Sequence, residues 1–327
     1  MAVNNLFRFA GIVFRGAQFG GVITLGGVTT SAVNMNPQVV QDYSDGNIHP
    51  TLTTLQAFAE DLQFTTNNVD KALALIGSVG ECIDDGSAIE VYYSRLSACA
   101  KGPAPGAVHR RIVITQSGAT AGLVYPNSFS CDHRGNASFS FSVMPETDGA
   151  NSPIVIQSDI ALPAELQVLI DNQNRYTIGP VNLAGDVYEG VKQVSIEFGI
   201  SLIRESADSV PFDEFIAIEK TANKISLTGI DPTWASSNVA GGAAGTIEGV
   251  QLQHADTSIV FRRRVNGTAR FEPAGDPVHV VLSTNGLAVV TNVASTNEQQ
   301  PAESGVDIYS DFDGANVPIT VQTDSAY

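Results

Sequence analysis

Short stretches in which apolar and polar residues alternate make up much of this chain, and they predict β-strands. In residues 139–143 the order is Phe, Ser, Phe, Ser, Val, so one side of that strand is expected to be buried and the other rich in hydroxyl groups. Glycine-rich segments separate many of these runs, as they do in hairpins. The pattern predicts strands over residues 6–14, 22–25, 31–35, 89–93, 111–115, 139–143, 259–261, 278–282 and 306–309.

One segment has the period of an α-helix. Four apolar residues fall on one face at 3.6-residue spacing: Val69, Ala72, Leu73 and Ile76. Asn67 is placed to cap the start of this helix and Gly77 to end it. We expect the apolar face to pack against a sheet. A single predicted helix among so many strands indicates a mainly β protein.

A fifteen-residue motif occurs twice and indicates an internal duplication. Residues 148–162 and 313–327 are identical at nine of fifteen positions, at an offset of 165 that is close to half of the 327-residue chain. At the same offset Val124 meets Val289. We therefore predict two tandem homologous domains, residues 1–170 and 171–327. Each is expected to be β-sandwich or barrel-like, with at most one short helix.

Two polar loops occupy corresponding places in the halves. The first runs from residue 42 to Pro50 and the second from residue 205 to Pro211. Exposed polar loops are available for contacts, so we predict that they reach neighbouring subunits. The acidic residues expected to make these contacts are Asp42, Asp45, Glu205 and Asp208.

The formal net charge of −17 excludes some classes of function. A protein this acidic lacks the clustered cations that binding to a nucleic-acid backbone or to an anionic membrane requires. Three cysteines, all in the first half, do not form a disulfide framework, so we expect reduced thiols and assembly in a cytoplasm. No secretion signal or membrane-spanning run is expected.

The repeated motif also raises the question of metal binding. Glu146, Asp148 and Asn151 surround Gly149 with oxygen ligands at the spacing of half a calcium loop, and Asp311, Asp313, Gly314 and Asn316 repeat it. The acidic residue that would complete a calcium loop is missing. An Asp-Gly turn that leads through Pro153 or Pro318 into a strand is the favoured interpretation.

No catalytic constellation is expected. Cys131, Asp132 and His133 are adjacent, but the second half keeps none of these side chains and no second Cys/His pair stands at zinc spacing. We expect no cofactor and no metal. The densest run of cations is Arg262, Arg263 and Arg264, and on an acidic chain we expect it to pair with acidic side chains of a neighbouring subunit rather than with nucleic acid.

These features together resemble the tail-tube proteins of tailed bacteriophages. The likeness covers both halves and depends on the duplicated β-domains, the single helix, the polar loops ahead of Pro50 and Pro211, and the repeated Asp-Gly-Ala-Asn-x-Pro-Ile strand. The resemblance implies a virion protein without enzymatic activity that forms stacked rings around a channel. Three two-domain chains would form each pseudo-six-fold ring. Its partners would be further copies and other tail proteins, with DNA only as a passing, non-specific cargo at genome ejection.

Three alternatives remain open from the residues alone. The chain could be another tail or capsid protein, or a carbohydrate- or receptor-binding β-sandwich module, for which Trp234 or the Tyr92-Tyr93 pair would have to supply exposed aromatic rings. A hydrolase that uses paired acids such as Asp84-Asp85 is a weaker alternative. Adjacent residues of a strand point to opposite sides and cannot share a substrate.

Overall fold

The structure of this chain is a computed structural model. It describes residues 6–44, 46–58, 60–84, 86–96, 103–115, 121–167, 174–183, 185–188, 190–207, 210–230, 251–252, 256–265, 268, 270–294 and 303–327.

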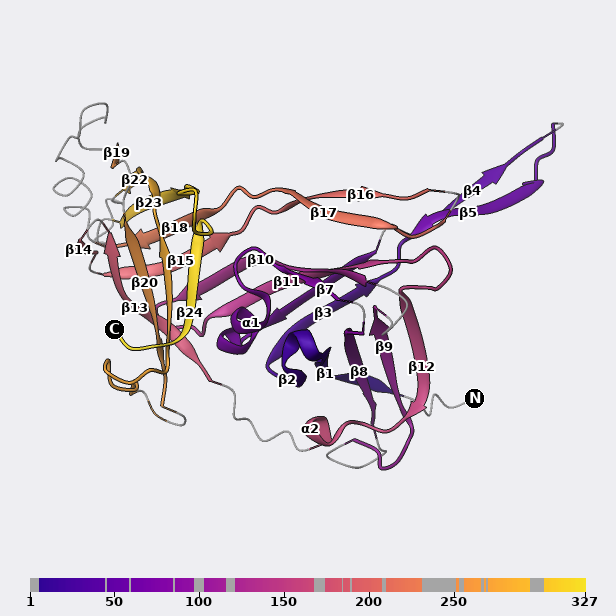
Figure 1. Ribbon diagram of the computed structural model, residues 1–327, viewed down its shortest axis with the longest axis horizontal. Coiled ribbons are helices and arrows are strands. Elements are labelled where there is room, and N and C mark those ends of the chain that lie inside the picture. Colours follow the sequence, from indigo (N-terminus) through magenta and orange to yellow (C-terminus); the bar gives the residue numbers. More distant parts are fainter. Residues whose placement is uncertain are drawn as a thin grey trace.

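The mainly β prediction is confirmed: antiparallel sheets account for most of the described chain (Figure 1). One five-stranded sheet has the order β12 (Ile154–Ile160), β9 (His109–Ile114), β8 (Ala88–Arg95), β1 (Phe7–Gly16), β2 (Gly21–Leu25). A second has the order β14 (Asp186–Val187), β13 (Tyr176–Leu183), β20 (Thr257–Arg263), β21 (His279–Thr284), β24 (Ile319–Ser325). Every predicted strand overlaps a strand of the structure.

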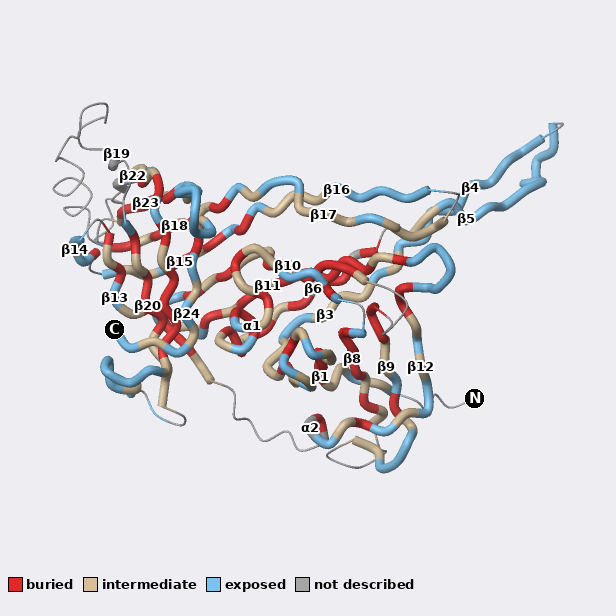
Figure 2. Tube along the Cα trace, viewed as in Figure 1, coloured by how far each residue is buried: buried red, intermediate tan, exposed pale blue. Residues whose placement is uncertain are grey.

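A larger sheet of ten strands joins the two parts of the chain. Its order is β19 (Gln251–Leu252), β22 (Gly286–Ala294), β23 (Glu303–Ser310), β18 (Lys224–Gly229), β15 (Val191–Glu197), β10 (Ala121–Asp132), β11 (Ser138–Glu146), β6 (Asp61–Thr66), β3 (Val28–Asn34). The tenth strand, β7 (Glu81–Ile83), pairs with β10. The core lies between this sheet and the two five-stranded sheets, as the buried segments in Figure 2 show.

Two hairpins extend the fold. The first arm consists of β4 (Pro37–Asp42) and β5 (Leu52–Phe58), and the second arm of β16 (Ser201–Glu205) and β17 (Phe215–Lys220). In Figure 1 the second arm runs along β10 and β11, whereas the first arm projects away from the body. The polar loops expected from the sequence are therefore the tips of two-stranded arms. Their strands were missed because none of the four has a strict alternation of apolar and polar residues.

The predicted helix is α1 (Val69–Ile76), and all four predicted apolar residues are buried. Its N-cap is Asn68 rather than Asn67, and the Asn68 side chain makes no capping hydrogen bond. Gly77 ends the helix with φ of 67°, a conformation that favours glycine. The helix packs against β24, β10 and β11, so it contacts both halves of the chain. A four-residue helical turn, α2 (Ala164–Gln167), and a 3-10 turn, Ala17–Phe19, were not expected.

Strand order repeats along the chain. The order β7-β10-β11-β6-β3 in the large sheet corresponds to β19-β22-β23-β18-β15, and β2-β1-β8-β9-β12 corresponds to β14-β13-β20-β21-β24. From β3 to β6 the two ladders match at a constant offset of 163, with a bulge after Val28 matching one after Val191 and another after Gln38 matching one after Ser201. The division into two homologous domains at residue 170 stays a prediction that this correspondence supports.

The ladders correct two details of the sequence alignment. Val124 lies opposite Val143 while Ala288 lies opposite Ile308, so the strands β10 and β22 correspond at an offset of 164 and Val124 meets Ala288 rather than Val289. Between the arms the offset of 163 places Pro50 against Asp213 instead of Pro211. The sequence alignment matched identical residues such as Pro50 and Pro211 in the loops. Strand pairing, which fixes the correspondence, cannot be seen in the sequence.

Candidate functional site

Both copies of the repeated motif form the same turn. Asp148 Oδ1 accepts hydrogen bonds from the backbone N–H of Ala150 (2.9 Å) and Asn151 (2.7 Å), and Asp148 Oδ2 accepts one from Asn151 Nδ2 (2.8 Å). In the second copy Asp313 accepts the same three bonds from Ala315 and Asn316 at 2.8, 2.6 and 2.8 Å. Gly149 (φ 80°) and Gly314 (φ 90°) both have the positive φ that the turn requires. After Pro153 and Pro318 the chain enters β12 and β24.

Hydrogen bonds within each turn stabilise the ionised form of its aspartate. Bonds from the Asn151 backbone and side chain, and then from Ala150, hold the pKa of Asp148 below its ordinary value. The corresponding bonds from Asn316 and Ala315 lower the pKa of Asp313 to about 2. Both carboxylates therefore stay ionised at neutral pH, with their oxygens engaged within their own turns.

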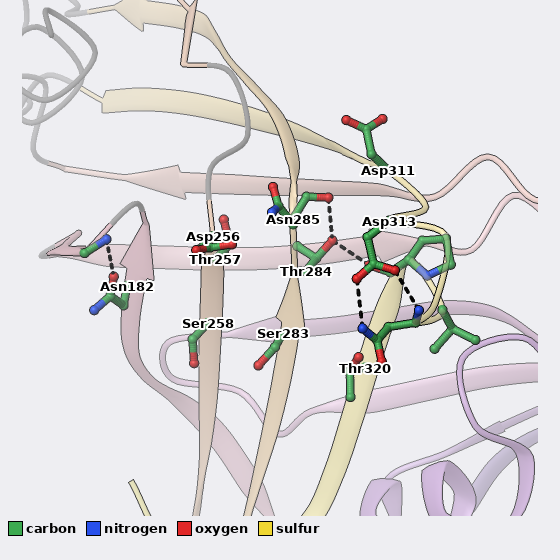
Figure 3. Close-up of a pocket in the computed structure, with 14 residues that line it drawn as sticks. Asn182, Asp256, Thr257, Ser258, Ser283, Thr284, Asn285, Asp311, Asp313 and Thr320 are labelled. Atoms are coloured by element: carbon green, nitrogen blue, oxygen red, sulfur yellow. Dashed lines mark hydrogen bonds between the residues drawn. The ribbon is translucent and has the colours of Figure 1, made fainter. Parts of the chain in front are cut away.

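The two turns differ in what lies beside them. Thr147 N donates to Asp213 O of the second arm at 2.9 Å, and a Cβ on Gly149 would stand 3.0 Å from Glu214 Oε1. A Cβ on Gly314 would meet nothing within 4 Å. Instead, the second turn lines an open pocket of about 770 Å³, shown in Figure 3, with Asp256, Ser283, Asn285 and Asp311 among its other walls.

The second arm is fixed onto the first half by several contacts beyond Thr147. Phe58 N donates to Pro211 O at 2.8 Å, and the Phe58 and Phe212 rings stack with centroids 4.8 Å apart. Arg204 Nη2 lies 3.3 Å from Glu60 Oε2 and also pairs with Asp213. The Glu60 side chain is 2% exposed. Burial raises its pKa while the Arg204 charge opposes that rise.

The halves are also joined by strand pairing, which we call the internal junction. In it β10 and β15 run antiparallel, with Ser128 opposite Glu197, Phe129 opposite Ile196 and Ser130 opposite Ser195. Below this ladder the Phe129 and Phe261 rings pack edge to face at 4.6 Å. The internal junction is therefore a continuous part of sheet and core.

Both strands that correspond to the internal junction lie at unpaired edges within the described chain. β3, which corresponds to β15, is the last strand of the ten-stranded sheet. On β22, which corresponds to β10, residues Asn292, Val293 and Ala294 pair with β23 on one side only, since β19 reaches only Val289 and Ala288. Unpaired edges of this kind are templates for further strands.

The face of the ten-stranded sheet opposite the core is rich in hydroxyl groups. Directly opposed residues form a row across five strands: Ser138, Ser130, Ser195, Ser226 and Asp307. Ser130 and Ser138 share a hydrogen bond of 2.9 Å. The predicted alternation in residues 139–143 holds for the buried Phe139, Phe141 and Val143, although Ser142 is buried as well.

The lysines on this hydroxyl-rich face have acidic partners. Lys224 Nζ lies 2.7 Å from Asp307 Oδ2, and that hydrogen bond is the main cause that raises the Lys224 pKa. Lys192 pairs with Glu303. Asp132 and Glu197 add two further exposed carboxylates to the same face. Its cations are thus offset by neighbouring acids and its net charge is negative.

The acidic loop residues predicted to meet other subunits fall at the arm tips where they are described. Asp42 ends β4 and its carbonyl accepts from Thr51 N at 2.8 Å. Glu205 ends β16 and its carbonyl accepts from Glu214 N at 2.9 Å, the corresponding bond. Asp45 and Asp208 lie outside the described residues. Contacts of these residues with another subunit stay predictions.

The three consecutive arginines make contacts within the chain. The Arg262 guanidinium lies 4.2 Å from the centre of the Phe271 ring. Arg263 N donates to His279 Nδ1 at 3.1 Å, and Arg264 Nη2 lies 3.5 Å from Gly135 O of the first half. Their pairing with acidic side chains of a neighbouring subunit stays a prediction.

Two sets of buried polar residues have no signal in the local sequence pattern. His109 and His279 occupy corresponding places, and each Nδ1 accepts a backbone N–H at 3.1 Å, from Arg95 and Arg263 respectively. The internal repeat could have revealed this pair, since His109 begins β9 and His279 begins β21, the corresponding strand of the other five-stranded sheet. Glu90 lies buried between Arg15 (2.5 Å) and Arg111 (2.6 Å), which no local pattern indicates.

The described residues of the carbohydrate-binding and catalytic alternatives are not presented on the surface as those functions require. Tyr92 is buried, with its hydroxyl 2.7 Å from Glu90 Oε2, and Tyr93 packs against Phe9. Trp234 and Asp85 lie outside the described residues. Burial raises the pKa of the Cys131 thiol to about 12, which keeps it protonated.

Comparisons with known proteins do not identify a relative. No protein-family model matches the chain, and no curated protein matches it in sequence. Within the described ranges, no group of three or more His, Cys, Asp or Glu side chains is arranged to hold a metal ion. No helix among these residues has the length and apolar character needed to cross a membrane.

Proposed function

We propose that this chain is a structural virion protein that closes into rings by repeating its internal junction between copies, and that the rings stack into the tail tube of a bacteriophage. In this proposal the chain consists of two homologous domains, residues 1–170 and 171–327. Three copies supply the six domains of each ring. Assembly takes place in the host cytoplasm, and the tube becomes part of the virion, where it contacts other tail proteins.

One observation carries the proposal: β10 and β15 are paired inside the chain, whereas in the described part of the chain their counterparts, residues 292–294 of β22 and strand β3, each pair on one side only. If the same rotation that relates the halves also relates successive copies, β22 of one copy meets β3 of the partner subunit. The register follows from the offsets of 164 and 163. Asn292 would then lie opposite Asn34 of the partner subunit, and Val293 opposite Val33 of the partner subunit.

A head-to-tail contact of this kind closes when the rotation completes a full turn. Closure removes the edges that otherwise favour uncontrolled strand addition. The ten-stranded sheets would then form a continuous wall. Its five-stranded sheets and core would lie on one side, which leaves the hydroxyl-rich face as the lining of the channel.

The chemistry of that face suits the passage of DNA. Affinity for DNA comes largely from cations that neutralise phosphates and release counterions. Here Lys224 and Lys192 are already paired with Asp307 and Glu303, and further carboxylates repel phosphate. The row of serines offers small polar groups without charge. DNA could therefore slide along this wall without binding tightly.

Cysteine cross-linking at the predicted junction tests the proposal. Directly opposed residues of antiparallel strands have Cα atoms about 4.5–5.5 Å apart, within the range of a disulfide. In a background with Cys82→Ser and Cys99→Ser, the variant Asn34→Cys/Asn292→Cys should give a ladder of cross-linked species that ends at the trimer. Electron microscopy of the same sample should show rings or tubes.

The control pair is Ala32→Cys/Asn292→Cys, which displaces one cysteine by two residues along β3. Diagonal neighbours lie about 7–8 Å apart, too far for a disulfide without movement of the backbone. A chain that remains monomeric at high concentration, with no cross-link in the first variant, would contradict the proposal. Equal cross-linking of both variants would contradict the predicted register.

A further inference from the structure

The second arm and the surface beneath it provide a template for a contact that the first arm does not make within its own chain. The arms have loops of equal length, since nine residues separate Asp42 from Leu52 and Glu205 from Phe215. The hydrogen bond from Thr51 N to Asp42 O matches the bond from Glu214 N to Glu205 O. Asn36 and Gly199, at the base of each arm, both have positive φ. The offset of 163 therefore holds for each residue of the arms.

The first arm carries apolar side chains that nothing in the described chain covers. Ile48 at its tip is 85% exposed, and Val39, Tyr43, Leu52 and Leu55 are also exposed. The base of this arm contacts the second arm through Phe58, but in Figure 1 its outer end points away from β20, β21 and β24 of its own chain. An exposed apolar arm of this kind is typical of an interaction site.

A matching surface lies on the second half. Phe312, which corresponds to Thr147, is 66% exposed, and Val317 beside it is exposed as well. The pocket at the Asp313 turn is open at the place where Glu214 of the second arm approaches the Asp148 turn. The second arm thus covers the Asp148 turn of the first half, whereas the corresponding surface at the Asp313 turn of the second half is open.

Three charged residues hold the second arm on the first half, and the three residues that correspond to them at the open surface of the second half and on the first arm are all uncharged. In the occupied one, Arg204 of the arm pairs with buried Glu60 and with Asp213. At an offset of 163 the corresponding residues are Gln41, Asn223 and Pro50. The cation and both anions are thus replaced by uncharged residues. This joint change is expected if Gln41 and Asn223 meet, because a charge on one side alone would be left unpaired.

Asn223 has an unmet hydrogen-bonding capacity. It is 6% exposed, and its buried Oδ1 atom has no hydrogen-bond partner among the residues that the structure describes. A buried amide oxygen without a partner is unfavourable, and side-chain amides carry the N–H donors that would satisfy it. Gln41 is exposed on the arm and has such donors.

We infer that the first arm of one copy docks on the second half of a partner copy, where the Gln41 side-chain amide donates to Asn223 Oδ1 of the partner subunit and residues 48–51 lie over the Asp313 turn. This inference rests on the proposed ring and names its second contact. The arm reaches the same neighbour that β22 and β3 join. Each interface between copies would then consist of a strand ladder and a docked arm. The two halves of one chain are joined in the same way, by the β10 and β15 ladder and the second arm.

The test uses the intact chain and measures the protein concentration at which half of it is assembled, by sedimentation. Gln41→Glu places a carboxylate against Asn223 Oδ1 and should raise that concentration at least about tenfold, because a buried carboxylate facing an acceptor is costly. Gln38→Glu, the same change at the base of the arm, should leave it within about threefold of the wild type. Both positions are exposed in the single chain, so neither change should prevent folding.

A charge-pair exchange makes the test specific. Asn223→Glu alone should weaken assembly, and Gln41→Arg/Asn223→Glu, which recreates the Arg204 and Glu60 pair, should restore it to within about threefold of the wild type. The Asn34→Cys/Asn292→Cys cross-link reports separately on the strand junction. If it forms but Gln41→Glu behaves as Gln38→Glu and the exchange gives no recovery, the docking inference is overturned while the ring stands. If wild-type chains neither cross-link nor assemble, both fail.

Discussion

The contribution of a buried polar residue to stability depends on whether its polar atoms have hydrogen-bond partners. His109 shows this clearly. It is 2% exposed, its Nδ1 accepts the Arg95 N–H, and burial is the main cause that lowers its pKa. The neutral ring therefore belongs to the folded state, since protonation of Nδ1 would replace an acceptor by a donor facing another donor.

This arrangement predicts acid sensitivity. The unfolded chain binds a proton at His109 near the ordinary pKa of about 6.5, whereas the folded chain binds it only at lower pH. The stability contributed by the neutral ring is thus present above about pH 6.5 and is lost as the pH falls from there through the folded-state pKa. Urea unfolding of the wild type between pH 7.5 and 5 should show this loss.

His109→Asn is the matched variant, because its Oδ1 can accept the same N–H without titrating. Its stability should change less with pH over this range than that of the wild type. The carboxylates are common to both proteins, so the difference between them isolates His109. Identical pH profiles for the two proteins would contradict this account.

At the scale of elements, α1 connects parts of the chain that are far apart in sequence. Its buried face packs against β10 and β11 of the first half and β24 of the second, and Ser78, just after its end, hydrogen-bonds to Ile319 O at 2.5 Å. The helix therefore stabilises the contact between the halves as well as the core of the first half.

Truncation of this helix should destabilise the whole chain. Leu73 is 2% exposed, and Leu73→Ala should lower the free energy of unfolding by about 2–5 kcal/mol through lost burial and a cavity. Lys71→Ala on the exposed side should change it by less than about 0.5 kcal/mol. Chemical denaturation followed by circular dichroism measures both. A loss for Leu73→Ala equal to that for Lys71→Ala would show that α1 is not part of the cooperative core.

For the whole molecule, the main question is how the hydroxyl-rich face meets DNA in the proposed tube. Its two lysines are held by acids, so removal of those acids should expose them. Glu303→Gln/Asp307→Asn should make assembled tubes bind a short DNA duplex more tightly than wild-type tubes do, with a steeper dependence on salt. Binding by fluorescence anisotropy across salt concentrations measures this.

The control for that experiment is Glu219→Gln/Asp276→Asn, which changes the net charge equally but at exposed positions outside the hydroxyl-rich face. These tubes should bind DNA no more tightly than the wild type. If both double variants gain affinity to the same extent, net charge alone governs binding, and the assignment of this face to the channel would be wrong. The result would leave the cross-linked junction unaffected.

Local patterns were sufficient to identify the elements whose signals lie within a few residues. The alternation in β11, the face of α1 and the Asp148 and Asp313 turns could all be predicted, because periodicity, glycine and turn chemistry act over short distances. The arms were missed since the sequences of β4, β5, β16 and β17 have no strict alternation of apolar and polar residues. Glu90 was missed because its partners, Arg15 and Arg111, are brought to it only by strand pairing.

What the sequence by itself determined was the class of structure and the presence of a repeat, since both are written as patterns along the chain. The tertiary structure decided which edges are filled and which remain open. Three features depend on contacts between residues far apart in sequence: the pairing of β10 with β15, the one-sided pairing of β3 and of residues 292–294 of β22 within the described ranges, and the buried Asn223 Oδ1, which no described residue partners. Register and burial arise from those contacts, so no local pattern encodes them.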